Sequence, residues 1–291
     1  MFRRKNNPEP KGLERMAADE DMQAEAQSLE QAVAGLTIGN GAAVSGGAVG
    51  PQAGLALAPR EVEHVPLNWR PGNGGHRSND ATLRLFREAG GLEAIKRFTT
   101  AFYQKAFADP VIDKFIREHD DPHGERFANW IAEKFGDGTP WTDERASRRV
   151  CPFHAHGHQF QTPHDRSSAH YAAWHSPKRE PERFGQHFKL DDCRIWMRLH
   201  FWAMRDAGIV ETSPSFAEYY VKFIAHFVSV YERTAPPFAR EALRWSADPA
   251  NIERYVAEGN QMPDVVGISF QDAAAQLPRD ERNSQGNWPY C

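Results

Sequence analysis

Seven of the thirteen histidines lie in one stretch of the chain, from Cys151 to His187. Neutral imidazole binds transition metals and transfers protons near neutral pH, so this stretch has the residue types that chemistry needs. The seven are His154, His156, His158, His164, His170, His175 and His187. Cys151 and the first three offer the sulfur and nitrogen ligands of a tetrahedral zinc site, but their alternate-residue spacing is not typical of structural zinc pairs. Cys151 and His154 also match a nucleophile and its base, although closeness in sequence gives no geometry. The residue types alone therefore favour a solvated, histidine-rich loop.

Two helices are predicted before this stretch. In the first, Ile95, Phe98 and Phe102 recur at helical period, and Asp109-Pro110 ends the helix because proline restricts the residue before it. The second has an apolar face formed by Phe127, Trp130, Ile131 and Phe135. A Gly-Asp-Gly sequence follows it, which is typical of a helix C-terminus.

Two further helices are predicted after the stretch. Asp191 is the expected N-cap of a helix that ends at Gly208, and a capping-box pattern at 215–218 opens another that Pro236-Pro237 stops. The apolar face of the first comprises Trp196, Met197, Leu199, His200, Phe201 and Met204, and that of the second Phe216, Tyr220, Phe223, Phe227 and Tyr231. Four helices without a convincing alternating strand predict an all-α domain. Taken alone, such stripes indicate the core of a four-helix bundle without a cofactor.

The chain divides by composition into a tail, a folded domain and an extension. Residues 1–80 are predicted to be a disordered, low-complexity tail, residues 81–236 the domain with a long insertion at 142–186, and residues 237–291 a C-terminal extension. Within the tail, Met16–Val33 favours a short helix. Ala32–Pro59 is uncharged but rich in Gly and Ala, which indicates a flexible linker rather than a membrane span.

Charge and cysteine content argue against several classes of protein. The formal net charge of −4 gives no reason to expect nucleic acid or an anionic membrane as a partner. Three scattered cysteines argue against a disulfide framework and fit a reducing compartment, so a cytoplasmic location is expected. The basic N-terminus MFRRKNNPEP has no apolar stretch behind it, and it is therefore not a secretory signal.

The order and spacing of the four helices resemble those of the truncated, two-over-two haemoglobins. The residues that carry the resemblance are Gly90-Gly91, Phe102-Tyr103, Asp109-Pro110, Phe115-Ile116, the Gly-Asp-Gly-Thr-Pro-Trp sequence from Gly136, and His187-Phe188-Lys189-Leu190. The resemblance covers Ala81 to about Ala235. It implies a globin-like fold, a b-type haem, and an iron that binds dioxygen or another diatomic gas.

The resemblance also implies site residues. His187 is the implied iron ligand, because it stands directly before the third helix and is followed by apolar residues, while His175 and His170 remain alternatives. Tyr103 is the implied distal residue, whose phenol would donate a hydrogen bond to bound dioxygen. The implied haem contacts are Phe115, Phe127, Trp130, Ile131 and Trp196, the last also a second candidate donor.

Two broader alternatives stay open at this point. A haem protein of this kind is compatible with oxidoreductase chemistry, such as nitric oxide dioxygenation or peroxide turnover, with a reductase as partner. The rival class is a haem-free, globin-like scaffold whose tails or histidine-rich insertion contact other proteins. A Soret absorption band in the purified protein separates the two classes.

Overall fold

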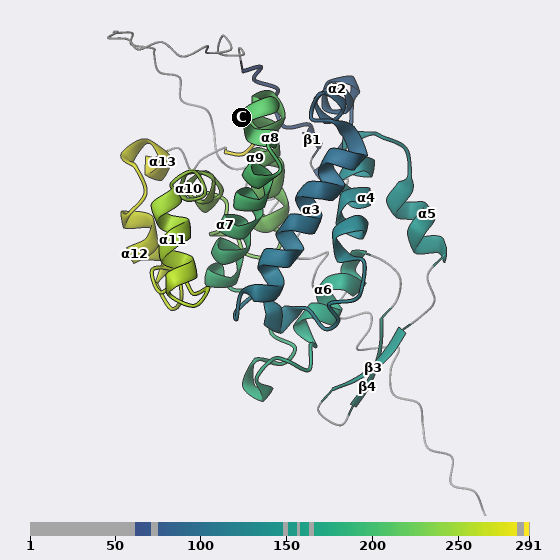
Figure 1. Ribbon diagram of the computed structural model, residues 1–291, viewed down its shortest axis with the longest axis vertical. Coiled ribbons are helices and arrows are strands. Elements are labelled where there is room, and N and C mark those ends of the chain that lie inside the picture. Colours follow the sequence, from purple (N-terminus) through teal and green to yellow (C-terminus); the bar gives the residue numbers. More distant parts are fainter. Residues whose placement is uncertain are drawn as a thin grey trace, which may run out of the picture. The chain divides into compact units, whose positions relative to one another are not determined.

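The computed structural model of the protein describes residues 62–70, 75–147, 151–155, 158–162, 166–283 and 288–290. For residues 151–155, 158–162, 166–169 and 283 this description covers the backbone only. Contacts divide the chain into two compact units, and one of them comprises Ala53–Trp69 and His76–Cys291. All the described helices belong to that unit, and they are drawn in Figure 1.

Helices make up most of the described chain, which confirms the predicted all-α class. The α-helices are α2 (Asp80–Glu88), α3 (Gly91–Ala108), α4 (His123–Phe135), α5 (Pro140–Ser147), α6 (Arg166–Trp174), α7 (Leu190–Asp206), α8 (Ile209–Thr212), α9 (Pro214–Ser229), α10 (Phe238–Trp245), α11 (Pro249–Ala257), α12 (Phe270–Ala275) and α13 (Arg279–Asn283). Two 3₁₀ turns, η1 (Asp113–Phe115) and η2 (Pro181–Arg183), join them. The described strands are β1 (Trp69–Arg70), β2 (Gly75–His76), β3 (Cys151–Ala155) and β4 (His158–Thr162).

The hairpin of β3 and β4 is an element that the sequence pattern did not predict. The two strands run antiparallel, with Cys151 opposite Thr162 and Ala155 opposite His158. In β3 the apolar residues Cys151, Phe153 and Ala155 do alternate with Pro152 and His154, but the run is only five residues long and contains a proline, and β4 has a single apolar residue, Phe160. The histidine-rich insertion therefore contains an ordered backbone pairing and is not only a loop.

The predicted helices α3 and α4 are confirmed at both of their C-terminal ends. α3 ends at Ala108, and the Asp109 backbone that follows it is extended, as the proline after it requires. α4 ends at Phe135, and Gly136 follows with φ 98°, a left-handed conformation that favours glycine. The buried side chains of α3 include Ile95, Phe98 and Phe102, as its period predicts.

The starts of α7 and α9 differ from the prediction by one or two residues. α7 begins at Leu190, so Asp191 lies in its first turn, and the backbone N–H of Lys189 donates to Asp192 at 2.8 Å. α9 begins at Pro214, one residue before the predicted capping box. It ends at Ser229, so the prediction that the helix continues to Pro236-Pro237 is wrong. Proline suits the first helical position because its missing N–H would have no partner there.

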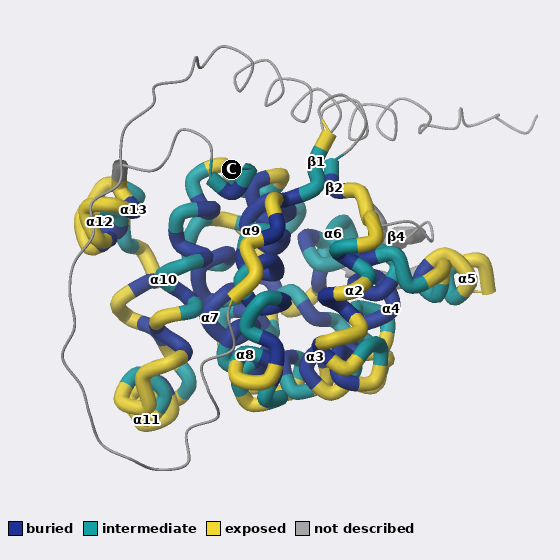
Figure 2. Tube along the Cα trace, turned by 90° about the horizontal axis from the view of Figure 1, so that it is seen from above, coloured by how far each residue is buried: buried dark blue, intermediate teal, exposed yellow. Residues whose placement is uncertain are grey.

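The core lies where α3, α4, α7 and α9 meet. Figure 1 shows α3 between α4 and α7, and α7 also packs on α10. Burial is concentrated in these helices, whereas α11 is largely exposed (Figure 2). The aromatic side chains predicted to line α9 are buried up to Phe227. The apolar periodicity therefore identified the correct faces of the helices.

Packed structure begins before Asp80, which is earlier than the sequence predicts. Val65, Leu67 and His76 are buried. The backbone N–H of Asn68 donates to the Tyr219 hydroxyl at 3.3 Å, and His76 Nε2 lies 2.7 Å from the same oxygen. Residues 62–69 thus line α9. The predicted short helix at 16–33 and the predicted linker lie outside the described residues.

The predicted C-terminal extension is packed against the rest of the domain. Tyr255 of α11 is 3% exposed, and its hydroxyl donates to Asp109 Oδ2 at 3.0 Å. Asp109 is itself buried, and its other oxygen accepts the backbone N–H groups of Val111 and Ile112. The extension therefore completes the turn between α3 and η1.

Replacing Tyr255 with Phe should destabilise the fold without opening a cavity. The substitution leaves Asp109 Oδ2 buried without a partner, which costs roughly 1.5–3 kcal/mol for a bond to a charged group. Urea unfolding at pH 7 measures this difference. Tyr290→Phe is the control, because that hydroxyl lies 3.3 Å from His226 Nδ1 and should matter less. Equal free energies of unfolding in Tyr255→Phe and the wild type would contradict the expectation.

Candidate functional site

Three helices contribute half-buried aromatic side chains to one cluster around Phe102. Tyr103 lies 5.1 Å from the Phe102 ring centroid, Trp196 lies 5.4 Å from it and Phe127 lies 6.4 Å from it. Phe127 and Trp196 are also 6.2 Å apart. Each of these three outer side chains keeps some exposed surface although it packs against the core. The structure thus brings together three of the residues that the sequence predicted for the site.

The Tyr103 hydroxyl has no hydrogen-bond partner among the described residues. Burial raises the pKa of Tyr103 to about 12, so the phenol is neutral at pH 7. A neutral phenol donates one hydrogen bond, and here the protein does not use it. The ring is held by its neighbours, since it stacks on His123 at 5.1 Å with an interplanar angle of 23°.

A loop with two histidines covers this side of α3. His123 is the first residue of α4, and its Nε2 lies 2.7 Å from the backbone oxygen of Glu118. His119 stacks on Phe107 at 4.2 Å, and its Nε2 lies 2.6 Å from Asp113 of η1. Burial lowers the pKa of His123, which therefore stays neutral at pH 7. The sequence reasoning missed His123, although Pro122 before it is a helix-start signal.

Behind the cluster lies His200 of α7, which is fully buried. Its ring stacks on Trp196 at 4.4 Å, and its Nε2 lies 2.9 Å from the Tyr220 hydroxyl. Its Nδ1 has no partner among the described residues. Burial holds the pKa of His200 well below its usual range, so the imidazole is neutral. The sequence pattern placed this residue on the apolar face, and there it acts as a core histidine.

The other predicted contact residues lie at different places. Trp130 stacks beside Phe127 at 5.8 Å, and Ile131 is fully buried in the core. Phe115 of η1 lies 5.0 Å from Phe188, on the side of η1 that faces the histidine-bearing segment. The contacts do not bring Phe115 against the Tyr103 cluster. The two groups are connected through η1, because His119 binds Asp113 of that same turn.

His187, the histidine that the sequence favoured, is exposed. Its ring stacks on Trp174 of α6 at 4.1 Å with an interplanar angle of 16°. No hydrogen bond to either of its ring nitrogens is present among the described residues. The stack places His187 on the outside of Trp174, and no described polar group fixes its tautomer.

The two alternative histidines each have an oriented ring. His175 Nδ1 lies 2.8 Å from the backbone oxygen of Tyr171. Its Nε2 is directed at Gly185, where an added Cβ would approach it to 3.3 Å. His170 Nδ1 lies 2.8 Å from the Tyr231 hydroxyl, and its ring meets Phe188 edge-on at 5.6 Å. Since Phe188 contacts Phe115, His170 belongs to the aromatic group at η1 and His175 does not.

Arg179 fixes the end of α6 to the loop that follows it. Its Nη1 donates to the backbone oxygens of Trp174 at 2.9 Å and Gln186 at 2.6 Å, and the guanidinium lies over the Phe115 ring. Burial lowers the pKa of Arg179, but the guanidinium remains charged at pH 7. The carbonyl oxygen of Trp174, the last residue of α6, is thereby satisfied by a side chain, and the same nitrogen holds Gln186 of the loop.

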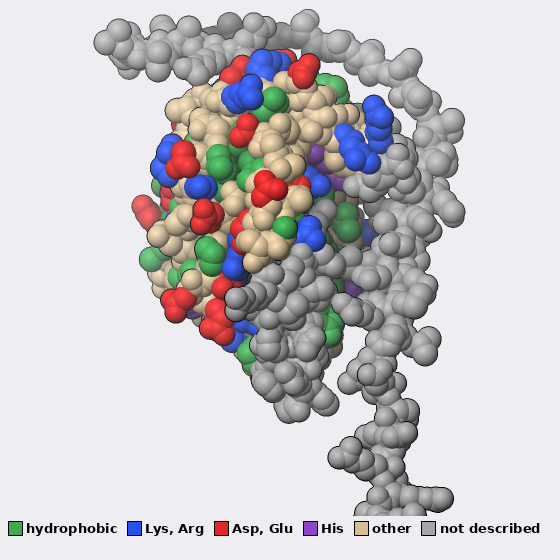
Figure 3. Space-filling model, turned by 90° about the vertical axis from the view of Figure 1, so that its right-hand side faces the viewer, with side chains coloured by type: hydrophobic (Ala, Val, Ile, Leu, Met, Phe, Trp, Pro, Cys, Tyr) green, Lys and Arg blue, Asp and Glu red, His purple; other side chains and the backbone are tan. Residues whose placement is uncertain are grey.

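The predicted zinc alternative lies outside the residues whose side chains are described, since it needs Cys151, His154, His156 and His158. In the described part of the chain, no group of three or more His, Cys, Asp or Glu side chains is placed to hold a metal ion. Figure 3 shows a few histidine side chains at the surface on this face.

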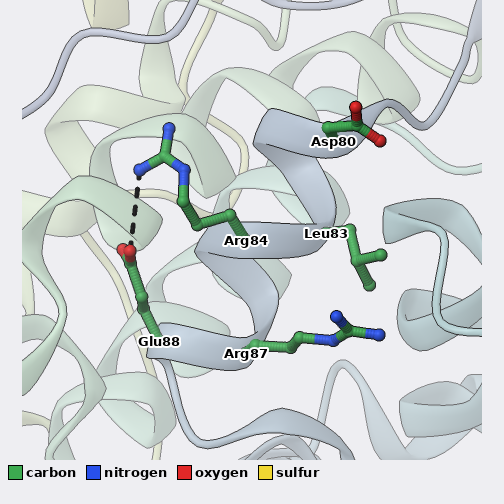
Figure 4. Close-up of a pocket in the computed structure, with 5 residues that line it drawn as sticks. All are labelled: Asp80, Leu83, Arg84, Arg87 and Glu88. Atoms are coloured by element: carbon green, nitrogen blue, oxygen red, sulfur yellow. Dashed lines mark ion pairs between the residues drawn. The ribbon is translucent and has the colours of Figure 1, made fainter.

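Two surface grooves lie apart from the aromatic cluster. One, of about 540 Å³, runs along α2 and is lined by Asp80, Leu83, Arg84, Arg87 and Glu88 (Figure 4). Its arginines are occupied by ion pairs, such as that of Arg84 with Glu63 at 2.6 Å. The other, of about 610 Å³, lies between α7 and α11 and includes Trp202. Neither groove is lined by a histidine or a cysteine.

No family model, no curated protein and no solved structure matches this chain. Among the described helices, none is both long enough and apolar enough to cross a membrane.

Proposed function

We propose that the protein is a haem protein of the truncated-haemoglobin type that binds a diatomic gas. The observation that carries the proposal is the Tyr103 cluster, in which a neutral phenol stands among half-buried aromatic side chains and has no hydrogen-bond partner in the part of the chain that the structure describes. A flat, apolar cofactor needs such aromatic surface, and a bound gas needs such a donor. Haem supplies the reversible binding of the gas at its iron.

The residues at η1 fit the proximal side of such a site, and we now favour His170 as the ligand over His187. A histidine that binds haem iron has its other ring nitrogen held by a hydrogen bond, which orients the ring. His170 has this bond through Tyr231 and stands beside Phe188. His187 is exposed and lacks such a bond among the described residues. Phe115 and Phe188 would contact the haem edge.

On the distal side, the protein's own side chains would bind the gas and exclude water. The Tyr103 hydroxyl would donate a hydrogen bond to a bound dioxygen and slow its loss. Trp196 would offer a second N–H donor, and Phe127 with Trp130 would keep water from the gas. His200 is buried and neutral, so it adds no charge to the site.

An absorption spectrum of protein expressed with haem supply tests the proposal. We expect a Soret band in the ferric and ferrous states, and a shift of that band with carbon monoxide. Haem extracted from the protein should match the b type. Absence of the band after reconstitution with haem would overturn the proposal and favour the haem-free scaffold that the sequence left open.

Replacing Tyr103 with Phe should speed the loss of dioxygen while the haem stays bound. The change removes a hydrogen bond to a polarised acceptor, so dioxygen should leave roughly ten to a hundred times faster. Carbon monoxide is a weaker acceptor and should change less. Stopped-flow dissociation of both gases makes the comparison, with Tyr290→Phe as a control away from the cluster. An unchanged dioxygen rate would make Tyr103 a packing residue and Trp196 the next donor to test.

A further inference from the structure

We propose that His123 is a positioning residue, which aims the Tyr103 hydroxyl at the gas ligand. The inference rests on the proposed haem function. Because no described residue accepts or donates at the hydroxyl, only contacts to the ring set where it points. Of the rings around Tyr103, His123 alone lies face to face with it, at 5.1 Å and 23°.

Neither of the other described ring contacts is parallel to Tyr103. Phe102 meets Tyr103 at 66° and Phe107 meets it at 45°, so both approach it at an angle. They limit how far the ring can swing, but they do not fix its plane. A hydrogen bond to a small ligand depends on placement within a fraction of an ångström. The stacked imidazole is therefore the contact that decides the direction of the phenol.

His123 is itself held firmly enough to serve as a fixed surface. The partner of its Nε2 is the backbone oxygen of Glu118, which only accepts, so Nε2 carries the proton and donates. His123 is the first residue of α4, and its backbone N–H donates to the backbone oxygen of Asp121 at 2.7 Å. The imidazole is thus fixed at the ring and at the helix.

The loop offers a matched control in His119. This residue also stacks on an aromatic side chain of α3, but on Phe107, which lies one helical turn beyond Tyr103. Loss of the His119 ring disturbs the same loop and the same helix while it leaves the face of Tyr103 covered. His123→Ala also loses the hydrogen bond to the Glu118 oxygen and an edge contact with Phe107, so an effect is assigned to the stacked ring only where His123→Phe restores the wild-type behaviour.

The test compares His123→Ala, His123→Phe and His119→Ala in the haem-loaded protein. In His123→Ala, dioxygen should dissociate roughly three to ten times faster, which is less than the effect of removing the hydroxyl itself. His123→Phe restores a stacked ring and should stay within about twofold of the wild type, as should His119→Ala. The C–O stretching frequency of the carbon monoxide complex should move only in His123→Ala.

A second readout needs no haem. The ring protons of Tyr103, assigned by comparison with Tyr103→Phe, should shift in the NMR spectrum of haem-free His123→Ala because the stacked ring is gone. If no variant binds haem, the proposed function fails, and this shift still tests the contact. If haem binds and His123→Ala releases dioxygen at the wild-type rate, the positioning role is refuted while the proposed function stands.

Discussion

His170→Gly is expected to purify without haem, or with haem that is lost within minutes, while the fold is retained. The ligand bond is the main attachment of a b-type haem, because no covalent link holds its ring. Glycine in α6 costs about 1 kcal/mol of helix stability, which is small beside the loss of the ligand. Added imidazole should enter the space that the side chain leaves and restore the Soret band.

The two other candidate histidines are the controls for this expectation. His187→Ala removes a ring that is exposed and stacked on Trp174, so haem retention should be close to that of the wild type. His175→Ala removes the bond to the Tyr171 oxygen and should weaken the end of α6 without removing the ligand. Loss of haem in His187→Ala, with haem kept in His170→Gly, would return the assignment to His187.

The difference between these histidines shows what sequence spacing can decide. The periodicity of Phe98 and Phe102 predicted the buried face of α3, because a helix fixes the direction of side chains along it. The segment from Trp174 to Leu190 has no such period. There the direction of His187 depends on its stack with Trp174 and on the two carbonyl bonds of Arg179, neither of which leaves a pattern in the sequence.

The same reason explains what was missed around the Tyr103 cluster. Tyr103, Phe127 and Trp196 were predicted for the site because each stands at a helical position that a family resemblance marks. His123 was not predicted for the site, because its proposed role depends on a ring contact with Tyr103 of α3. The packing of residues 62–69 on α9 was also missed, since the apolar residues Val65, Leu67 and Trp69 form only a short run beside a long stretch of turn residues. Contacts between segments that are distant in the sequence therefore cannot be predicted from local sequence patterns.

Arg198→Met is expected to destabilise the fold by roughly 1.5–3 kcal/mol, because Glu241 loses hydrogen bonds to a charged donor and is only partly open to water. Arg198 of α7 is 3% exposed. Its Nε and Nη2 donate to Glu241 of α10, and its Nη1 donates to Asp264 at 2.7 Å. Met keeps most of the side-chain volume, so the loss of stability comes from the lost ion pairs. Glu241 would stay in place as a carboxylate with little access to water.

Arg194→Met, one helical turn away, should leave stability unchanged or raise it by up to about 2 kcal/mol. Arg194 is 2% exposed, and its Nε and Nη1 are buried without a hydrogen-bond partner among the described residues. Its guanidinium lies over Phe238 at 4.6 Å, a contact worth about 1 kcal/mol. Burial lowers the pKa of Arg194, which reflects the cost of the unpaired charge. An apolar side chain of similar size removes that cost.

The two variants thus test whether the effect of a buried arginine in α7 on stability depends on its ion pairs or on its burial alone. Urea unfolding at pH 7 of both variants and of the double variant gives the free energies and their coupling. The expected order is Arg194→Met at or above the wild type, and Arg198→Met well below it. If Arg194→Met loses as much stability as Arg198→Met, the Arg194 guanidinium must have a partner in solution, such as an ordered water that bridges it to the unpaired Oε2 of Glu241.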